Sequence, residues 1–276
     1  MKKIIYPIFA VVVFLVMQAI AGGILGLIGL ILSPETLNEV RTTGDPNALM
    51  TAVAPDALAW GIALSGIATV GIIALLKMID WKNVLNIKTI RWGWGAVSVV
   101  AAICGIFALD ILEEMMDLPN LMEDMFTDMA NSVMGVLCIA IVGPVVEELV
   151  FREAFLGYMV RNGVNKWIAI ITSALAFGII HLNPAQVPFA AAMGFILGII
   201  YYKTGNIVIP IILHVLNNSV AVWQMHVLGD AAKDFSMIEW LGGQGKSMIL
   251  LCVCSFLCAA LLTHFWRKYK KIDINQ

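Results

Sequence analysis

The chain has 276 residues, of which 61% are hydrophobic and 13% are charged, and its formal net charge at pH 7 is −2. In soluble domains about a quarter of the residues are charged, and the mean hydropathy here is +0.91, so the composition excludes a soluble globular protein. It predicts an all-α membrane protein whose helices cross the bilayer several times. Since the basic residues form no patch, we expect no nucleic-acid partner.

Eight stretches are apolar and long enough to be predicted as spanning helices of about 20 residues. In chain order they are Ile4–Leu32, Ala57–Met78, Trp94–Leu112, Val133–Tyr158, Trp167–Leu182, Val187–Tyr202, Asn206–Leu228 and Ser247–Trp266. The fifth and sixth are short and are separated only by residues 183–186. No linker or internal repeat divides the series, so we expect one membrane domain over residues 1–276, in which residues 133–228 form the core.

Lys and Arg in short loops favour the cytoplasmic side of a membrane, so they predict the orientation of the spans. With the N terminus inside, the inner segments hold Lys2, Lys3, Lys77, Lys82, Lys88, Arg91, Arg161, Lys166, Lys203, Arg267, Lys268, Lys270 and Lys271. The outer segments hold Arg41, Lys233 and Lys246. An even number of spans with both termini cytoplasmic accounts for this distribution, and only Arg152 is left inside a span.

Polar side chains gather in the C-terminal half of the chain, whereas the first, second and eighth predicted spans have almost none in their interiors. The interior polar residues are Glu147, Glu148, Arg152, Glu153, His181, His214, Asn217 and Asn218. At a rise of about 1.5 Å per residue, the glutamates and both histidines lie at about 12 to 21 Å from the inner ends of their helices. A hydrocarbon core is about 30 Å thick, so one buried site can contain them all. The five cysteines fall within predicted spans and are expected to be unpaired.

The first motif is the pair of adjacent glutamates, Glu147 and Glu148, followed by Arg152. A carboxylate in a bilayer costs a few kcal/mol and normally faces the protein interior with a partner. Neighbouring residues of a helix differ by about 100° in direction, so the two acids cannot point the same way. Glu148 and Arg152 have the i,i+4 spacing of an ion pair. Glu147 is left freer as a general base, although an exchange of the two roles and a purely structural ion-paired cluster both stay open.

Two further motifs each place a histidine on a predicted helix. Phe177 and His181 are one turn apart, which suits either a site residue or a packing histidine. His214 and Asn218 are also one turn apart and could offer two donors to an oxyanion, or could join helices by hydrogen bonds.

Taken together, the glutamate pair with arginine, the Phe-x3-His motif and the His-x3-Asn motif resemble the CPBP family of intramembrane proteases. That family includes type II CAAX prenyl endopeptidases and bacteriocin-processing or immunity proteins. The motifs cover residues 147–218, about a quarter of the chain, and an eight-span bundle is also what the resemblance implies.

The resemblance implies a role for each motif residue. Glu147 would activate a water for attack on a peptide carbonyl, with His181 assisting. His214 and Asn218 would stabilise the oxyanion. Glu148, Arg152 and Phe177 would support the site. The family has also been described as zinc-dependent, and in that case the candidate ligands are Glu147, His181 and His214. A metal-free mechanism without a cofactor is favoured, because these three groups come from separate helices.

Two other functions remain open at this point. A proton- or ion-coupled transporter also places acids and histidines within the membrane, and a non-catalytic immunity or scaffold protein could keep the same fold. We expect a multi-pass protein of the plasma membrane of a prokaryote, in contact with the lipid bilayer and with a peptide or protein substrate. The sequence does not decide between a prenylated tail, a leader peptide and another membrane-associated substrate.

Overall fold

The computed structural model describes residues 2–32, 38, 41–43, 54–84, 91–228, 231 and 235–269, and every regular element in these ranges is helical. The helices, with π-helices marked η, are α1 (Lys2–Leu32), α4 (Pro55–Leu75), α5 (Trp81–Val84), α6 (Trp92–Met116), α7 (Glu123–Ala130), α8 (Val133–Leu137), η2 (Cys138–Val142), α9 (Gly143–Glu148), η3 (Leu149–Gly157), α10 (Tyr158–Arg161), α11 (Lys166–Ile179), α12 (Gln186–Thr204), α13 (Val208–Leu228), α14 (Met237–Trp240) and α15 (Gln244–Lys268). Four of the basic residues used above, Lys88, Lys233, Lys270 and Lys271, lie outside the described residues.

Seven helical runs in the described ranges are long and apolar enough to cross a membrane, which confirms an all-α polytopic bundle. The exception is α11, which has 14 residues, so the predicted fifth span was too long at its C-terminal end. We expected this span to reach Leu182, but that residue has a left-handed backbone with φ 51°, which an L-residue in a continuing helix does not adopt. His181 therefore lies in the turn that follows α11.

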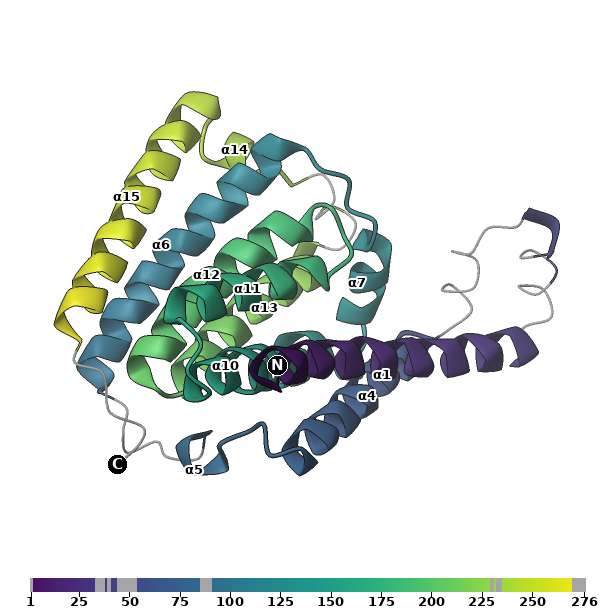
Figure 1. Cartoon of the computed structure of the whole chain (residues 1–276). Helices are drawn as coiled ribbons and strands as arrows, with labels where there is room; N and C mark the ends of the chain where they lie inside the picture. Colours follow the sequence, from purple (N-terminus) through teal and green to yellow (C-terminus); the bar gives the residue numbers. More distant parts are fainter. Residues whose placement is uncertain are drawn as a thin grey trace.

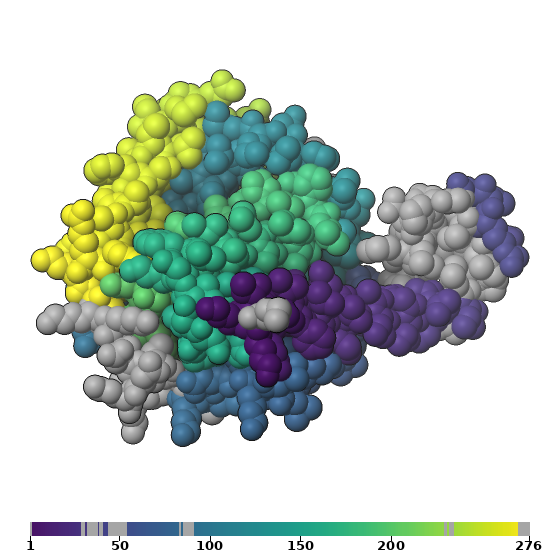
Figure 2. Space-filling view, in the orientation of Figure 1, coloured from purple at the N-terminus to yellow at the C-terminus, as the bar shows by residue number. Residues whose placement is uncertain are grey.

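The helices pack largely in antiparallel neighbours. α1 packs along α4, α6 along α15, and α11 along α12, as Figure 1 shows for the last two pairs. In Figure 2, α15 lies along the left edge of the molecule and α1 runs across the front toward the right, and only 17% of the most apolar window of each is buried. Their exposed apolar side chains suit contact with lipid.

One continuous helical run, from Val133 to Arg161, passes through the middle of the bundle. It contains both π-helical segments, η2 and η3, on either side of the short α9 that carries the two glutamates. All nine residues of η3 are buried, against Phe14 of α1, Ile170 of α11 and other members of the main hydrophobic core. π-Helical turns are rare and frequently mark functional sites.

A buried polar cluster anchors the far end of this central run. The carboxylate of Glu153, which is 1% exposed, accepts a hydrogen bond from the hydroxyl of Tyr201 and one from the guanidinium of Arg161, at 2.6 Å. Arg161 also donates to the carbonyl oxygen of Met78 at 2.8 Å. These bonds join the central run to α12 and to the end of α4, so Glu153 is a structural residue.

Small residues allow the close packing of α11 on α12. A Cβ atom added at Gly178 would lie 2.6 Å from the carbonyl oxygen of Val187 and 2.7 Å from Cβ of Ala191. Gly178 therefore permits the close approach of α12. All five cysteines are free, as predicted.

Candidate active site

The carboxylate of Glu148 lies at the centre of the site and is completely buried. Its Oε2 atom is 3.1 Å from Nε of Arg152, one turn along the central run, so the predicted ion pair is confirmed. Its Oε1 atom is 2.9 Å from Nδ1 of His214 on α13. A carboxylate oxygen accepts hydrogen bonds, so the tautomer of His214 that matches this contact carries its hydrogen on Nδ1.

The second ring nitrogen of His214 faces the other glutamate. Nε2 of His214 is 3.6 Å from Oε2 of Glu147, and the side chain of Glu147 is 21% exposed whereas that of His214 is 6% exposed. The imidazole therefore lies between the two carboxylates. Glu148 fixes the orientation of the ring, and Glu147 is the carboxylate that remains accessible.

Arg152 is the largest fully buried side chain in the described part of the protein. Its Nε atom is close to Glu148, but the N–H is not aligned for a hydrogen bond, and neither terminal nitrogen has a hydrogen-bond partner. The guanidinium instead lies over the ring of Phe177, with its central carbon 4.5 Å from the ring centroid. A cation held against an aromatic face in a dry environment is stabilised by the ring quadrupole, so Phe177 supports the ion pair.

Phe177 also separates the two histidines. Its ring makes edge contacts with His181, at 5.0 Å between centroids, and with His214, at 5.6 Å. Nδ1 of His181 is 2.8 Å from the carbonyl oxygen of Phe177. No hydrogen bond or ion pair joins His181 to Glu147 in the described residues, so His181 borders the site without touching the proposed base.

Asn218 lies one turn beyond His214 on α13. Its amide nitrogen donates to the carbonyl oxygen of Ile139 in η2, at 3.0 Å, and its side-chain oxygen accepts a hydrogen bond from Asn217. One N–H of the Asn218 amide is therefore engaged in holding α13 against η2, and the amide keeps a second N–H.

The three candidate zinc ligands do not form a three-ligand site in this arrangement. Glu147 and His214 are neighbours, and the Nδ1 atoms of His214 and His181 contact Glu148 and the carbonyl oxygen of Phe177, which leaves Nε2 as the available nitrogen of each ring. Among the described residues, no group of three or more His, Cys, Asp or Glu side chains is placed to hold a metal ion.

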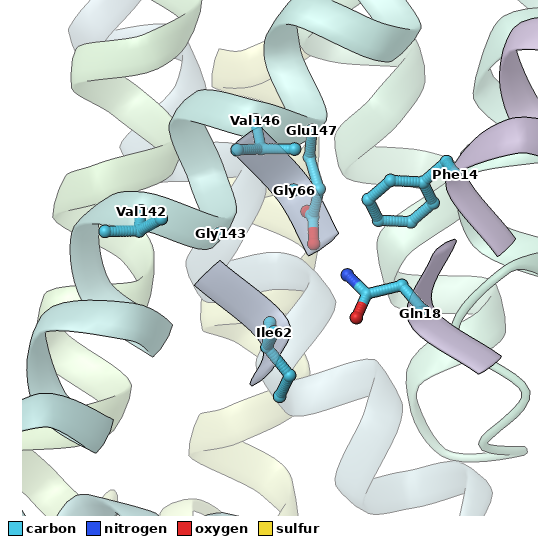
Figure 3. Close-up of a pocket in the computed structure, with 8 residues that line it drawn as sticks. All are labelled: Phe14, Gln18, Ile62, Gly66, Val142, Gly143, Val146 and Glu147. Atoms are coloured by element: carbon cyan, nitrogen blue, oxygen red, sulfur yellow. The ribbon is translucent and has the colours of Figure 1, made fainter. Parts of the chain in front are cut away.

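The sequence motifs on α9, α11 and α13 are neighbours in the structure, but two features of the site were not predicted. The sequence predicted Glu148 paired with Arg152 alone and not the bond from Glu148 to His214, since this bond depends on how α13 is rotated. It also placed all polar chemistry in the C-terminal half, whereas Gln18 of α1 lines a small cavity beside Glu147 (Figure 3). Gln18 could have been singled out in the sequence, because it is the single amide within the long apolar run of the first predicted span.

Residues 129–220 match a family model described as type II CAAX prenyl endopeptidase Rce1-like. The matched core of this chain is similar to that family. It includes α9, α11, α12 and most of α13, and therefore every residue of the site except Gln18.

Two bacterial relatives agree with the match. The chain is 34% identical over 83 residues to YdiL, a candidate membrane peptidase of Bacillus subtilis (strain 168), and 33% identical over 90 residues to the membrane-embedded CAAX protease MroQ of Staphylococcus aureus (strain USA300). Each alignment covers 30% of this chain and about a third of the relative (34% and 36%). No solved structure matches the chain. With its seven spanning helices, the chain is a multi-pass integral membrane protein of a prokaryote.

Proposed function

We propose that this protein is an intramembrane endopeptidase that hydrolyses a peptide bond with a water molecule activated by Glu147. The observation that carries the proposal is the imidazole of His214 held between a fully buried carboxylate, Glu148, and a partly exposed one, Glu147. A carboxylate with space beside it and a positioned imidazole is the arrangement that general-base hydrolysis needs. The family match of residues 129–220 supports the same reaction class.

In the proposed mechanism the carboxylate of Glu147 takes a proton from the water as the water oxygen bonds to the peptide carbonyl carbon. The carbonyl oxygen becomes an oxyanion. The intermediate then breaks its C–N bond, and Glu147 returns the proton to the departing amine nitrogen. The same carboxyl group thus acts first as base and then as acid.

Stabilisation of the oxyanion is assigned to His214 and Asn218. With a proton on both ring nitrogens, His214 donates from Nδ1 to Glu148 and presents Nε2–H to the site. The charges of the two glutamates, Arg152 and this imidazolium then sum to zero, which suits a site of low dielectric. Asn218 offers its second amide N–H. Donors fixed in place before the reaction are a major source of catalysis in such sites. His181, at the border of the site, is assigned an assisting role toward the water.

The substrate is proposed to be a peptide of a membrane-associated protein, either prenylated or carrying a leader. The partly exposed Glu147 and the apolar surroundings favour a substrate that enters from the membrane rather than from water. The CAAX protease named among the relatives supports this class.

The decisive experiment compares membrane-peptide proteomes of cells carrying the wild-type protein and the Glu147→Gln variant. We expect cleavage products to disappear in the variant, a loss of at least about 100-fold in rate, because general-base catalysis contributes about 10²- to 10⁴-fold. Glu239→Gln, a matched change at an exposed glutamate of α14, should leave the products unchanged. The protein should still insert and fold, as judged by its yield and melting temperature.

Several outcomes would contradict the proposal. Retained cleavage by Glu147→Gln would exclude Glu147 as the base, and full complementation of the cellular phenotype by Glu147→Ala would favour a non-catalytic binding protein. Activity that is lost on exhaustive chelation and restored by added zinc would replace the metal-free mechanism with a metal-dependent one.

A further inference from the structure

A small cavity of about 20 Å³ lies directly against the carboxylate of Glu147, between α1, α4 and α9 (Figure 3). A cavity needs about 10 to 15 Å³ and two to four polar partners to hold an ordered water, so this one has room for a single water molecule. Only two of the lining residues have polar side chains, namely Glu147 and Gln18; the others are apolar residues and glycines. The polar groups available to a water here are therefore few and well defined.

Gln18 is held in place by a residue of the neighbouring helix. The hydroxyl group of Ser65 on α4, which is 4% exposed, lies 3.0 Å from Oε1 of Gln18 and 2.9 Å from the carbonyl oxygen of Ile62, and its one hydrogen can be donated to either acceptor. With its oxygen facing Ser65, the amide of Gln18 presents its nitrogen to the cavity, and Figure 3 shows this nitrogen directed at the carboxylate of Glu147. A donor facing a carboxylate is the electrostatically matched orientation.

The position of Gln18 in the sequence supports a specific role. It is the single amide side chain in α1, a 31-residue helix whose other residues from Ile8 onward are apolar. A polar group in a lipid-facing helix is costly unless it has partners inside the protein. α1 pairs Gln18 with Ser65 on one side and directs it at Glu147 on the other.

We propose that Gln18 is a positioning residue of the water site, and this inference rests on the proposed hydrolytic function. The amide nitrogen of Gln18 donates a hydrogen bond to the oxygen of one water, and the same water donates a hydrogen to Glu147. This pair of bonds leaves a lone pair of the water free for the peptide carbonyl and aligns its proton with the base. Glutamine orients the attacking water in the same manner in some nucleotide hydrolases.

Kinetic measurements on two variants of the full-length protein in nanodiscs test this role, with a fluorogenic peptide that spans the first cleavage site found in the proteome comparison. Gln18→Leu removes the amide at similar volume and should lower kcat about 10- to 100-fold while KM changes by less than about twofold, because one hydrogen bond to the reacting water is lost.

Gln18→Glu places a second carboxylate at the water. Because this favours protonation of Glu147, the acidic limb of the pH–rate profile should move to higher pH. The other groups near Glu147, which are His214, Glu148, Arg152 and Cys138, are unchanged in both variants.

Gln224→Leu provides the matched control, since it makes the same substitution at a half-buried glutamine of α13. It should leave kcat and the pH profile at wild-type values. A Gln18→Leu protein that melts like the wild type but keeps its kcat would overturn the inference. If Glu147→Gln is inactive in the same assay, the proposed hydrolase stands while the role of Gln18 falls.

A spectroscopic measurement separates the two proposals when no peptide is cleaved. Infrared difference spectra between each protein and its Glu147→Gln derivative isolate the carboxyl bands of Glu147. These bands should shift in Gln18→Leu, because the water that hydrogen-bonds to Glu147 is lost or displaced, and should not shift in Gln224→Leu. Unchanged bands in Gln18→Leu would reject the water site regardless of protease activity. Shifted bands in a protein that cleaves nothing would retain the site and reject the hydrolase.

Discussion

Glu148 is the most constrained carboxylate of the site, because one of its oxygens contacts the imidazole of His214 and the other the guanidinium of Arg152. It therefore links the central helical run to α13 and fixes the charge balance of the site. Glu147, one residue earlier, has no comparable set of partners and remains accessible. Adjacent side chains on a helix point in directions about 100° apart. Glu147 and Glu148 therefore have different surroundings, although they are chemically identical.

Removal of Arg152 should therefore destabilise the protein strongly. In Arg152→Met the carboxylate of Glu148 loses its permanent cation, and breaking a buried ion pair costs about 3 to 5 kcal/mol. Thermal melting in detergent should show a clear loss, and the double variant Glu148→Gln/Arg152→Met should recover part of it while remaining inactive. Strictly additive effects of Glu148→Gln and Arg152→Met would show that the pair is not coupled.

At the scale of single residues, the sequence predicted pairs along one helix and missed pairs between helices. Glu148 and Arg152 were predictable because the i,i+4 spacing determines their proximity. The contact of Glu148 with His214 was not predictable, since the rotation of α13 about its axis depends on packing. The role of Gln18 was not predicted either, because its contact with Ser65 depends on how α1 packs against α4.

The helical elements depart from regular geometry where the site is built. The central run contains π-helical turns on both sides of α9, whose wider winding a uniform turn of 3.6 residues does not describe. α11 also departs from a regular helix at its C-terminal end. Leu182 has a left-handed backbone and Asn183 is buried, so the helix does not continue through these residues. The side chain of Asn183 accepts a hydrogen bond from the backbone of Leu121 and donates one to Asn120. Apolar periodicity predicted the spans but carried no information on these local breaks.

Gly178 offers a test of how tightly α11 must lie on α12. In Gly178→Ala the new methyl group meets the backbone of Val187, so α11 must move and carry His181 with it. Overpacking of this kind costs about 1 to 3 kcal/mol, which should appear as a lower melting temperature together with reduced cleavage. Gly71→Ala on α4 is the matched control, because nothing lies within 4 Å of the added Cβ atom, and alanine favours the helix. Wild-type stability of Gly178→Ala would mean that α11 and α12 separate easily.

Over the whole molecule, the basic ends of several helices come together at one end of the bundle. The ammonium groups of Lys166, at the start of α11, and Lys203, at the end of α12, both lie over the ring of Trp266 near the end of α15, at 5.1 and 4.8 Å. Arg91, before α6, lies over Tyr269, which follows α15. Residues that the positive-inside rule assigns to one side are therefore neighbours in space. That this side is the cytoplasm stays a prediction.

Cysteine labelling of intact cells should establish the orientation. A membrane-impermeant maleimide should label Lys246→Cys, at the opposite end of α15, and should label Lys203→Cys only after the cells are permeabilised. The parent protein provides the background, since its five cysteines fall within the spanning helices. Labelling of Lys203→Cys from outside would reverse the topology.

The water cavity takes its walls from α1, α4 and α9, and the imidazole beside Glu147 comes from α13. These segments leave the ribosome in sequence, with nearly 200 residues between Gln18 and His214. During synthesis, therefore, the glutamate enters the membrane before its histidine partner, and no complete catalytic group exists until α13 docks. The proposed hydrolytic site is therefore assembled only after this late helix has been inserted.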